Sequence, residues 1–186
     1  GATSAVPPRK KKPAATGLAL LAAPECAASG PPSEVRTLEG AITEAGGAVL
    51  GTFREPLGGR WLVLASLPLG KVAATPYQRE LSDAHVKRLA EVIPKVGRFL
   101  DPIIAVQAGD LFWTPNGMHR LEAMRRLDAK AIVALVVPER EVAFRILALN
   151  TEKAHNLKDK ALEVIRMARR LAGAPETASA KEQDFA

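Results

Sequence analysis

The stretch of the chain that decides the fold is Phe112-Trp-Thr-Pro-Asn-Gly-Met-His-Arg-Leu-Glu-Ala-Met-Arg-Arg-Leu127. Its first residues favour a strand, Pro115-Asn116-Gly117 favours a turn, and the residues from Met118 onward favour a short helix. Gly117 permits a close approach of the backbone that a side chain would prevent. The stretch therefore predicts a strand that passes through a glycine turn directly into a helix.

Strands and helices alternate on both sides of this stretch. Apolar spacing and capping residues predict helices over residues 33–45, 82–96, 141–149 and 159–171. Strands are predicted over residues 61–65, 102–106, 111–113 and 131–137, and the second and third of these should form a hairpin. The run 131–137 is apolar throughout, which predicts burial on both faces. The order predicts a compact α/β (α+β) domain: a small mixed sheet flanked by helices, with a helical C-terminal end.

Composition excludes several classes of protein. A single cysteine among 186 residues rules out an internal disulfide and a zinc site made of cysteine pairs, and it favours a cytoplasmic location. No apolar run is long enough to span a membrane, so no membrane partner is expected. The net charge of +6 permits nucleic acid or nucleotide as a partner, whereas 4% aromatic residues make a base-stacking platform a poor interpretation.

The glycine turn is the main candidate site. The first turn of a helix leaves backbone N–H groups without acceptors, and the helix dipole is positive there. His119 and Arg120 lie in that turn, Asn116 and Gly117 precede it, and Thr114 is close enough to add a hydroxyl. This pattern predicts an anion site suited to phosphate. The alternative is structural: Arg120 pairs with Glu122 or Glu139, and the glycine only makes a turn.

Two further clusters hold polar residues in short runs. Residues 150–156, expected as a loop between the last two helices, contain Asn150, Glu152 and Lys153; Glu152 would be the oxygen ligand of a magnesium ion. The alternative is that the asparagines cap helices. In Thr75-Pro-Tyr-Gln-Arg79, Arg79 would join a phosphate site, or it would be an ordinary surface arginine.

These three stretches, in this order, resemble the N-terminal domain of the ParB family, which shares its fold with sulfiredoxin. Thr75-Pro-Tyr-Gln-Arg79 resembles the family's Asn-Pro-x-Gln-Pro-Arg element, and Gly117-Met-His-Arg120 falls on its Gly-Glu-Arg-Arg box. Pro102-Ile-Ile-Ala-Val106 matches its Pro-Ile-x-Val strand. Asn150 and Lys153 fall on the asparagine and arginine of its Glu-Asn-x-x-Arg box. The resemblance covers residues 67–171.

The resemblance implies a cytidine nucleotide (CTP) with magnesium as ligand, and a role on DNA in bacterial chromosome partition. Composition and pattern predict a disordered, Pro/Ala-rich basic tail at residues 1–32, a helix–strand extension at 33–66, a basic helix at 158–172 and a flexible tail at 173–186, and the resemblance places the nucleotide-binding domain at 67–157. In the helix, Arg166, Arg169 and Arg170 would face DNA, which would place the protein at the nucleoid. A homodimer is left open.

The chain departs from the family pattern at two positions. Met118-His119 replaces Glu-Arg, and Leu149 stands where the family has its magnesium-binding glutamate. Two alternatives therefore remain open. One is an enzyme of the same fold, a nucleoside triphosphatase, nuclease or phosphotransferase, with His119 as acid–base or phosphate ligand and Glu152 as metal ligand or base. The other is an interaction domain whose pocket is vestigial. Sulfiredoxin chemistry is excluded, because Met118 replaces the reactive cysteine.

Overall fold

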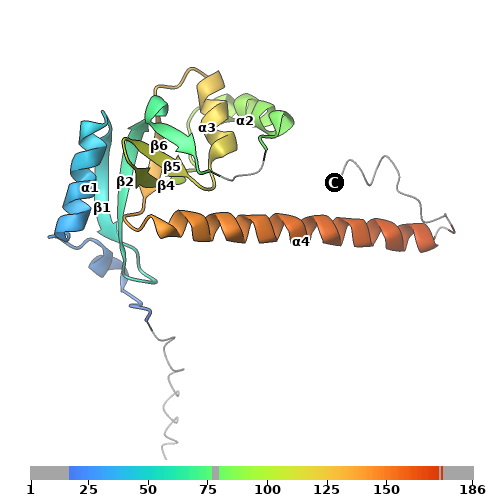
Figure 1. The fold of residues 1–186 in the computed structure, drawn as a ribbon, viewed down its shortest axis with the longest axis horizontal. Coiled ribbons are helices and arrows are strands. Elements are labelled where there is room, and N and C mark those ends of the chain that lie inside the picture. The colour runs from blue at the N-terminus through green and yellow to red at the C-terminus, as the bar shows by residue number, and fades with distance from the viewer. Residues whose placement is uncertain (1–16, 77–79, 172, 174–186) are drawn as a thin grey trace, which may run out of the picture.

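The computed structural model describes residues 17–76, 80–171 and 173, and within the last helix it leaves out the side chains of residues 150–161 and 163. The described part contains a six-stranded mixed sheet surrounded by helices (Figure 1). The strands in chain order are β1 (Ala48–Arg54), β2 (Trp61–Pro68), β3 (Val72–Ala74), β4 (Ile103–Ala108), β5 (Leu111–Thr114) and β6 (Ala131–Val136). Across the sheet their order is β1-β2-β6-β4-β5-β3. The predicted α/β class with a small mixed sheet is confirmed.

The sheet is mixed because the chain returns to it both by hairpins and by helical crossovers. β1 with β2, β2 with β6, and β4 with β5 are antiparallel pairs. β4 runs parallel to β6, and β3 runs parallel to β5. The predicted hairpin between β4 and β5 is confirmed. The helix α3 (Met118–Arg126) follows β5 and leads the chain to β6, so the quoted stretch forms the connection that sets the topology.

The core lies on one face of the sheet, beneath α3 and the helix α1 (Ser33–Glu44). Alternate residues of the central strands point into this core. They are Val63, Ala65, Leu67, Ile132, Ala134 and Val136, all at most 1% exposed. The residues between them on β6 are only half-buried, so the prediction that this strand is buried on both faces is wrong. Its apolar run is continuous because the opposite face is partly covered as well.

The helix α2 (Asp83–Val96) begins and ends as its sequence predicts. Ser82 is the N-cap residue, and its hydroxyl oxygen accepts a hydrogen bond from the backbone N–H of His85 at 3.4 Å. Gly97 ends the helix with a φ of 76°, in the left-handed region that favours glycine. Pro94 lies inside the last turn without ending the helix.

The last helix differs from the prediction. Residues expected to form two helices and a loop form the single 31-residue helix α4 (Glu141–Leu171). Residues 150–156 contain neither glycine nor proline, so nothing in them stops a helix, and their polar side chains suit an exposed one. Figure 1 shows α4 extending away from the sheet. The predicted loop at this cluster is therefore wrong.

The N-terminal part of the chain also differs. Residues 17–32 were expected in a disordered tail, but they include the short 3₁₀ helix η1 (Ala23–Cys26) and lie on the β1–β2 hairpin. The backbone N–H groups of Leu20 and Leu21 donate to the carbonyls of Leu57 and Pro56 at 3.1 and 2.7 Å. These backbone hydrogen bonds need no particular side chains, which explains why a Pro/Ala-rich composition did not predict them.

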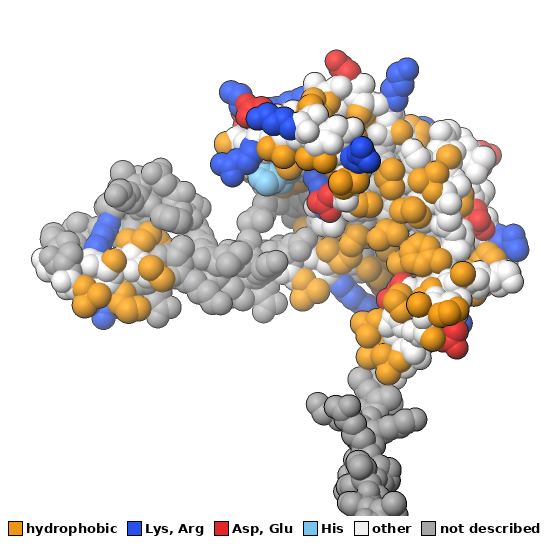
Figure 2. All heavy atoms as spheres, turned by 180° about the vertical axis from the view of Figure 1, so that it is seen from behind, with side chains coloured by type: hydrophobic (Ala, Val, Ile, Leu, Met, Phe, Trp, Pro, Cys, Tyr) orange, Lys and Arg blue, Asp and Glu red, His pale blue; other side chains and the backbone are white. Residues whose placement is uncertain are grey.

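Exposed hydrophobic side chains gather at the outer end of α4. Val164, Met167 and Leu171 are 63%, 53% and 87% exposed. Figure 2 shows this group apart from the hydrophobic side chains over the body of the molecule. Among the described residues, no helix combines the length and the hydrophobicity that crossing a bilayer requires.

Candidate functional site

Gly117 is the N-cap residue of α3, and its role is close packing. Its φ of −117° is open to any residue. A Cβ at this position, however, would overlap Cγ2 of Ile103 and lie 2.7 Å from Oγ1 of Thr114. The close approach that the sequence predicts is therefore present, and the group that approaches is the Ile103 side chain at the start of β4.

Asn116 and Thr114 hold the turn together from within. The Asn116 Oδ1 accepts hydrogen bonds from the Ile104 backbone N–H at 3.1 Å and from the Thr114 hydroxyl at 3.3 Å. Thr114 is completely buried. Both residues were predicted to bind phosphate. Their described contacts fix the end of β5 against the start of β4.

Arg120 turns toward the backbone of neighbouring segments. Its Nη1 donates to the carbonyls of Asp101 and Pro102 at 2.8 and 3.3 Å, and its Nη2 donates to the carbonyl of Asn116 at 3.2 Å. Nη1 also lies 2.9 Å from the Asp101 carboxylate, and the arginine side chain is only 15% exposed. The predicted alternative partners, Glu122 and Glu139, are not among these groups. Arg120 therefore ties the glycine turn to the segment that enters β4.

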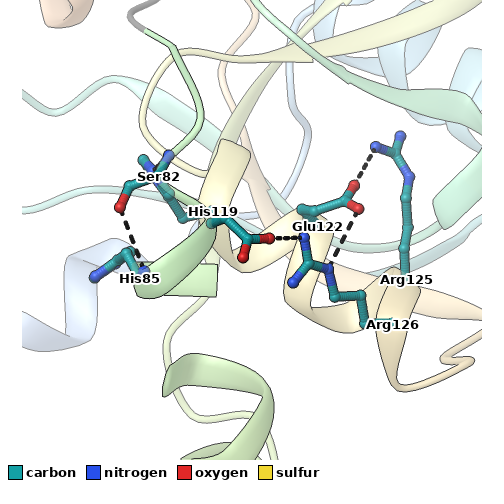
Figure 3. Close-up of polar contacts among 7 residues, drawn as sticks. Ser82, His85, His119, Glu122, Arg125 and Arg126 are labelled. Atoms are coloured by element: carbon teal, nitrogen blue, oxygen red, sulfur yellow. Dashed lines mark hydrogen bonds and ion pairs between the residues drawn. The ribbon is translucent and has the colours of Figure 1, made fainter. Parts of the chain in front are cut away.

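His119 brings the beginnings of two helices together. Its Nε2 accepts a hydrogen bond from the backbone N–H of Ser82 at 3.0 Å, so the start of α3 contacts the start of α2 (Figure 3). The ring of His85, in the first turn of α2, lies edge-on to the His119 ring with 4.7 Å between centroids. Both helix N-termini carry a positive partial charge. This is the place in the described structure where such charges converge.

Three ion pairs flank this meeting point. Arg126 on α3 lies 2.6 Å from the Asp83 carboxylate on α2. Glu122 pairs with Arg126 at 3.7 Å and with Arg125 at 3.5 Å (Figure 3). The hydrogen bond to Asp83 raises the pKa of the Arg126 guanidinium above its ordinary value. These opposite charges balance one another locally, so an anion at the helix starts would meet mainly backbone N–H groups and His119.

Several predicted site residues fall outside the described part. Arg79 lies in the segment 77–79, and the side chains of Asn150, Lys153 and Glu152 are not described, so their predicted roles stay predictions. The described residues contain no cluster of three or more acidic, histidine or cysteine side chains placed to hold a metal ion. In the described end of α4, Arg166 and Arg170 are exposed and Arg169 is half-buried.

Three residues of this region were missed or underrated by sequence reasoning. Ser82 was predicted only to begin the helix over residues 82–96, and His85 was given no role. Thr75 is 2% exposed, and its hydroxyl oxygen has no hydrogen-bond partner among the residues that the structure describes. Its backbone N–H donates to the carbonyl of Thr114 at 3.1 Å, which places it beside the glycine turn. None of these contacts follows from spacing along the chain, because each joins distant segments.

A hollow of about 170 Å³ lies elsewhere on the molecule. Its walls include Glu44 of α1, Lys71 and, from the β4–β5 turn, Asp110. It contains none of the predicted site residues.

Comparison with protein-family models and with curated proteins gives no match. Comparison with solved structures finds similarity to sulfiredoxin from Arabidopsis thaliana, with 25% identity, a TM-score of 0.38, and coverage of 46% of this chain and 96% of that one. It also finds similarity to the C-terminally truncated chromosome-partitioning protein ParB from Caulobacter crescentus complexed with CTP-gamma-S, with 17% identity, a TM-score of 0.41, and coverage of 64% and 68%.

Proposed function

We propose that this domain binds the phosphate groups of a nucleotide where α2 and α3 begin. The observation that carries the proposal is the contact between Ser82 and His119, which brings two helix N-termini together. Backbone N–H groups in the first turn of a helix have no acceptor within it and favour a bound anion. His119 supplies a side chain that donates once it carries a second proton.

The sequence resemblance selects CTP as the first nucleotide to test, with Mg²⁺ as its counter-ion. In this proposal Gly117, Asn116, Thr114 and Arg120 act on the phosphate indirectly, by fixing the turn from which the α3 amides project. Arg120 is thus a positioning residue. The proposal assigns direct contact to the amides at the two helix starts and to His119.

A thermal-shift screen tests the proposal. The four nucleoside triphosphates are added with and without Mg²⁺ at two salt concentrations. A ligand present at about a hundred times its Kd stabilises the folded state by about 2.7 kcal/mol, which corresponds to a rise in Tm of roughly 5–10 °C for a chain of this size. The variant His119→Phe should lose this shift, whereas His119→Arg should keep it because a guanidinium still donates. His85→Gln serves as the matched control.

One observation favours a second candidate, an interaction domain with a vestigial pocket. Arg120, the cation expected to face the phosphate, is turned to backbone carbonyls and to Asp101. If no nucleotide changes Tm under any condition of the screen, this second candidate replaces the first. Phosphate release abolished by His119→Ala would instead favour the enzyme alternative.

The proposal includes association with DNA through the end of α4. Arg166, Arg169 and Arg170 stand three and four positions apart, which places them on one side of the helix. Each phosphate contact adds about 0.9 to the slope of log K against log salt. Replacing the three arginines with glutamine should therefore lower that slope by about 2–3 for a DNA duplex. Replacing the exposed Arg36, Arg60 and Arg98 serves as the charge-matched control and should leave the slope nearly unchanged.

A further inference from the structure

In this structure His119 accepts a hydrogen bond at the position where an anion would require donors. Its Nε2 lies 3.0 Å from the backbone nitrogen of Ser82, whose N–H points at it. A ring nitrogen accepts a hydrogen bond only when it carries no proton, so the His119 imidazole is neutral here with its proton on Nδ1. The contact therefore occupies both the Ser82 N–H and the Nε2 lone pair of His119.

We infer that an anion binding at this site takes up one proton, which His119 accepts. The inference rests on the proposed function and adds its regulation by pH. When Nε2 gains a proton from solvent, the hydrogen bond from Ser82 breaks because two donors then face each other. The Ser82 N–H and the new Nε2–H both become available to the anion. The one covalent change is the new N–H bond at Nε2 of His119, and it adds one positive charge to the site.

Most of the described charged side chains near His119 are paired with one another. From α2, the ring of His85 lies edge-on to His119, and Asp83 is paired with Arg126. From α3, Glu122 is paired with Arg125 and Arg126, while Arg120 is turned to the carbonyls of residues 101 and 102. Glu80 is exposed in the segment that leads into α2. The positive ends of the two helices favour the neutral imidazole while no anion is bound, and a bound phosphate reverses that preference.

The sign of the pH dependence follows from linkage. Because the bound form holds the proton more tightly, the pKa of His119 is higher with the anion than without it, and affinity is greatest at low pH. Between the pKa of the free form and the pKa of the bound form, affinity should fall about tenfold for each pH unit. The phosphate itself also titrates. The pH dependence of affinity is therefore compared with that of a variant that cannot titrate at position 119.

The test is calorimetric titration of the full chain with CTP and Mg²⁺ near pH 6 and near pH 8, in buffers of different ionisation enthalpy. Wild type is compared with His119→Gln, whose amide oxygen accepts from Ser82 without titrating, and with His85→Gln. Near pH 8, wild type and His85→Gln should take up about one proton more per nucleotide than His119→Gln does. Equal proton uptake in wild type and His119→Gln overturns the inference and leaves the proposed function standing.

A second measurement decides the matter if His119→Gln does not bind. The ring ¹⁵N resonances of wild type, assigned with His85→Gln, should show His119 as the neutral Nδ1–H form in the free protein. The His119 resonances should change to those of an imidazolium ring when CTP saturates the site near pH 8. A neutral ring at saturation overturns the inference. Absence of any binding heat in wild type at both pH values overturns the proposed function as well, so the two failures are distinguishable.

Discussion

At Gly117 the available space admits a hydrogen atom and nothing larger. A methyl group there would overlap Ile103 and press on the hydroxyl of Thr114, both of which are buried. Gly117→Ala should therefore destabilise the fold by about 1–3 kcal/mol, as overpacking does. Thermal denaturation measures this loss. Gly40→Ala is the control, because Gly40 lies in α1 with open space around it and alanine should stabilise the helix by up to about 1 kcal/mol. A Tm for Gly117→Ala equal to that of wild type would contradict this account of the turn.

Arg120 gives a second prediction at the same scale. Removing its guanidinium leaves three backbone carbonyls without their charged donor, and hydrogen bonds to charged groups contribute about 1.5–3 kcal/mol each when buried and less when exposed. Arg120→Ala should therefore lower the free energy of unfolding by about 1–3 kcal/mol. Asp101→Asn should change it by less than about 1 kcal/mol, because that carboxylate is largely exposed and the backbone contacts remain. A variant Arg120→Ala that keeps its stability but loses nucleotide binding would show a ligand-binding residue instead.

At the scale of elements, sequence pattern predicted what depends on neighbours along the chain. The Ser82 cap, the Gly97 stop and the strand–turn–helix through Gly117 all follow from residues within a few positions. β1 was missed because Gly51 and a register shift after Val49 disturb its alternation, and it forms by pairing with β2. The contacts of His119 and Arg120 were missed because their partners, Ser82 and Asp101, lie far from them in sequence.

We predict that α4 is one continuous helix through residues 150–156. Proline removes a backbone donor and clashes with the preceding turn, which costs about 3 kcal/mol inside a helix and little in a loop. Ala154→Pro should therefore reduce the helical circular-dichroism signal, and wild-type Cα chemical shifts across residues 150–156 should be helical. Ala154→Ser is the control that preserves the backbone. Loop-like chemical shifts, with no loss of helical signal in the proline variant, would restore the two-helix interpretation.

At the scale of the whole molecule, the N-terminal segment 17–32 is part of the folded domain. Leu20 and Leu21 donate to the β1–β2 hairpin, and the Ala19 methyl group lies against Gly59, where a Cβ would meet it at 2.6 Å. Deleting residues 1–16 removes none of these contacts, so Tm should stay within a degree or two of wild type. Deleting residues 1–29 removes two backbone hydrogen bonds and exposes the hairpin end, which should lower Tm by several degrees. Gly59→Ala, which displaces Ala19 and requires a φ of +68°, should lower Tm in the chain that retains residues 17–32. If both deletions melt at the wild-type temperature, the folded unit begins at α1 and the segment only rests on it.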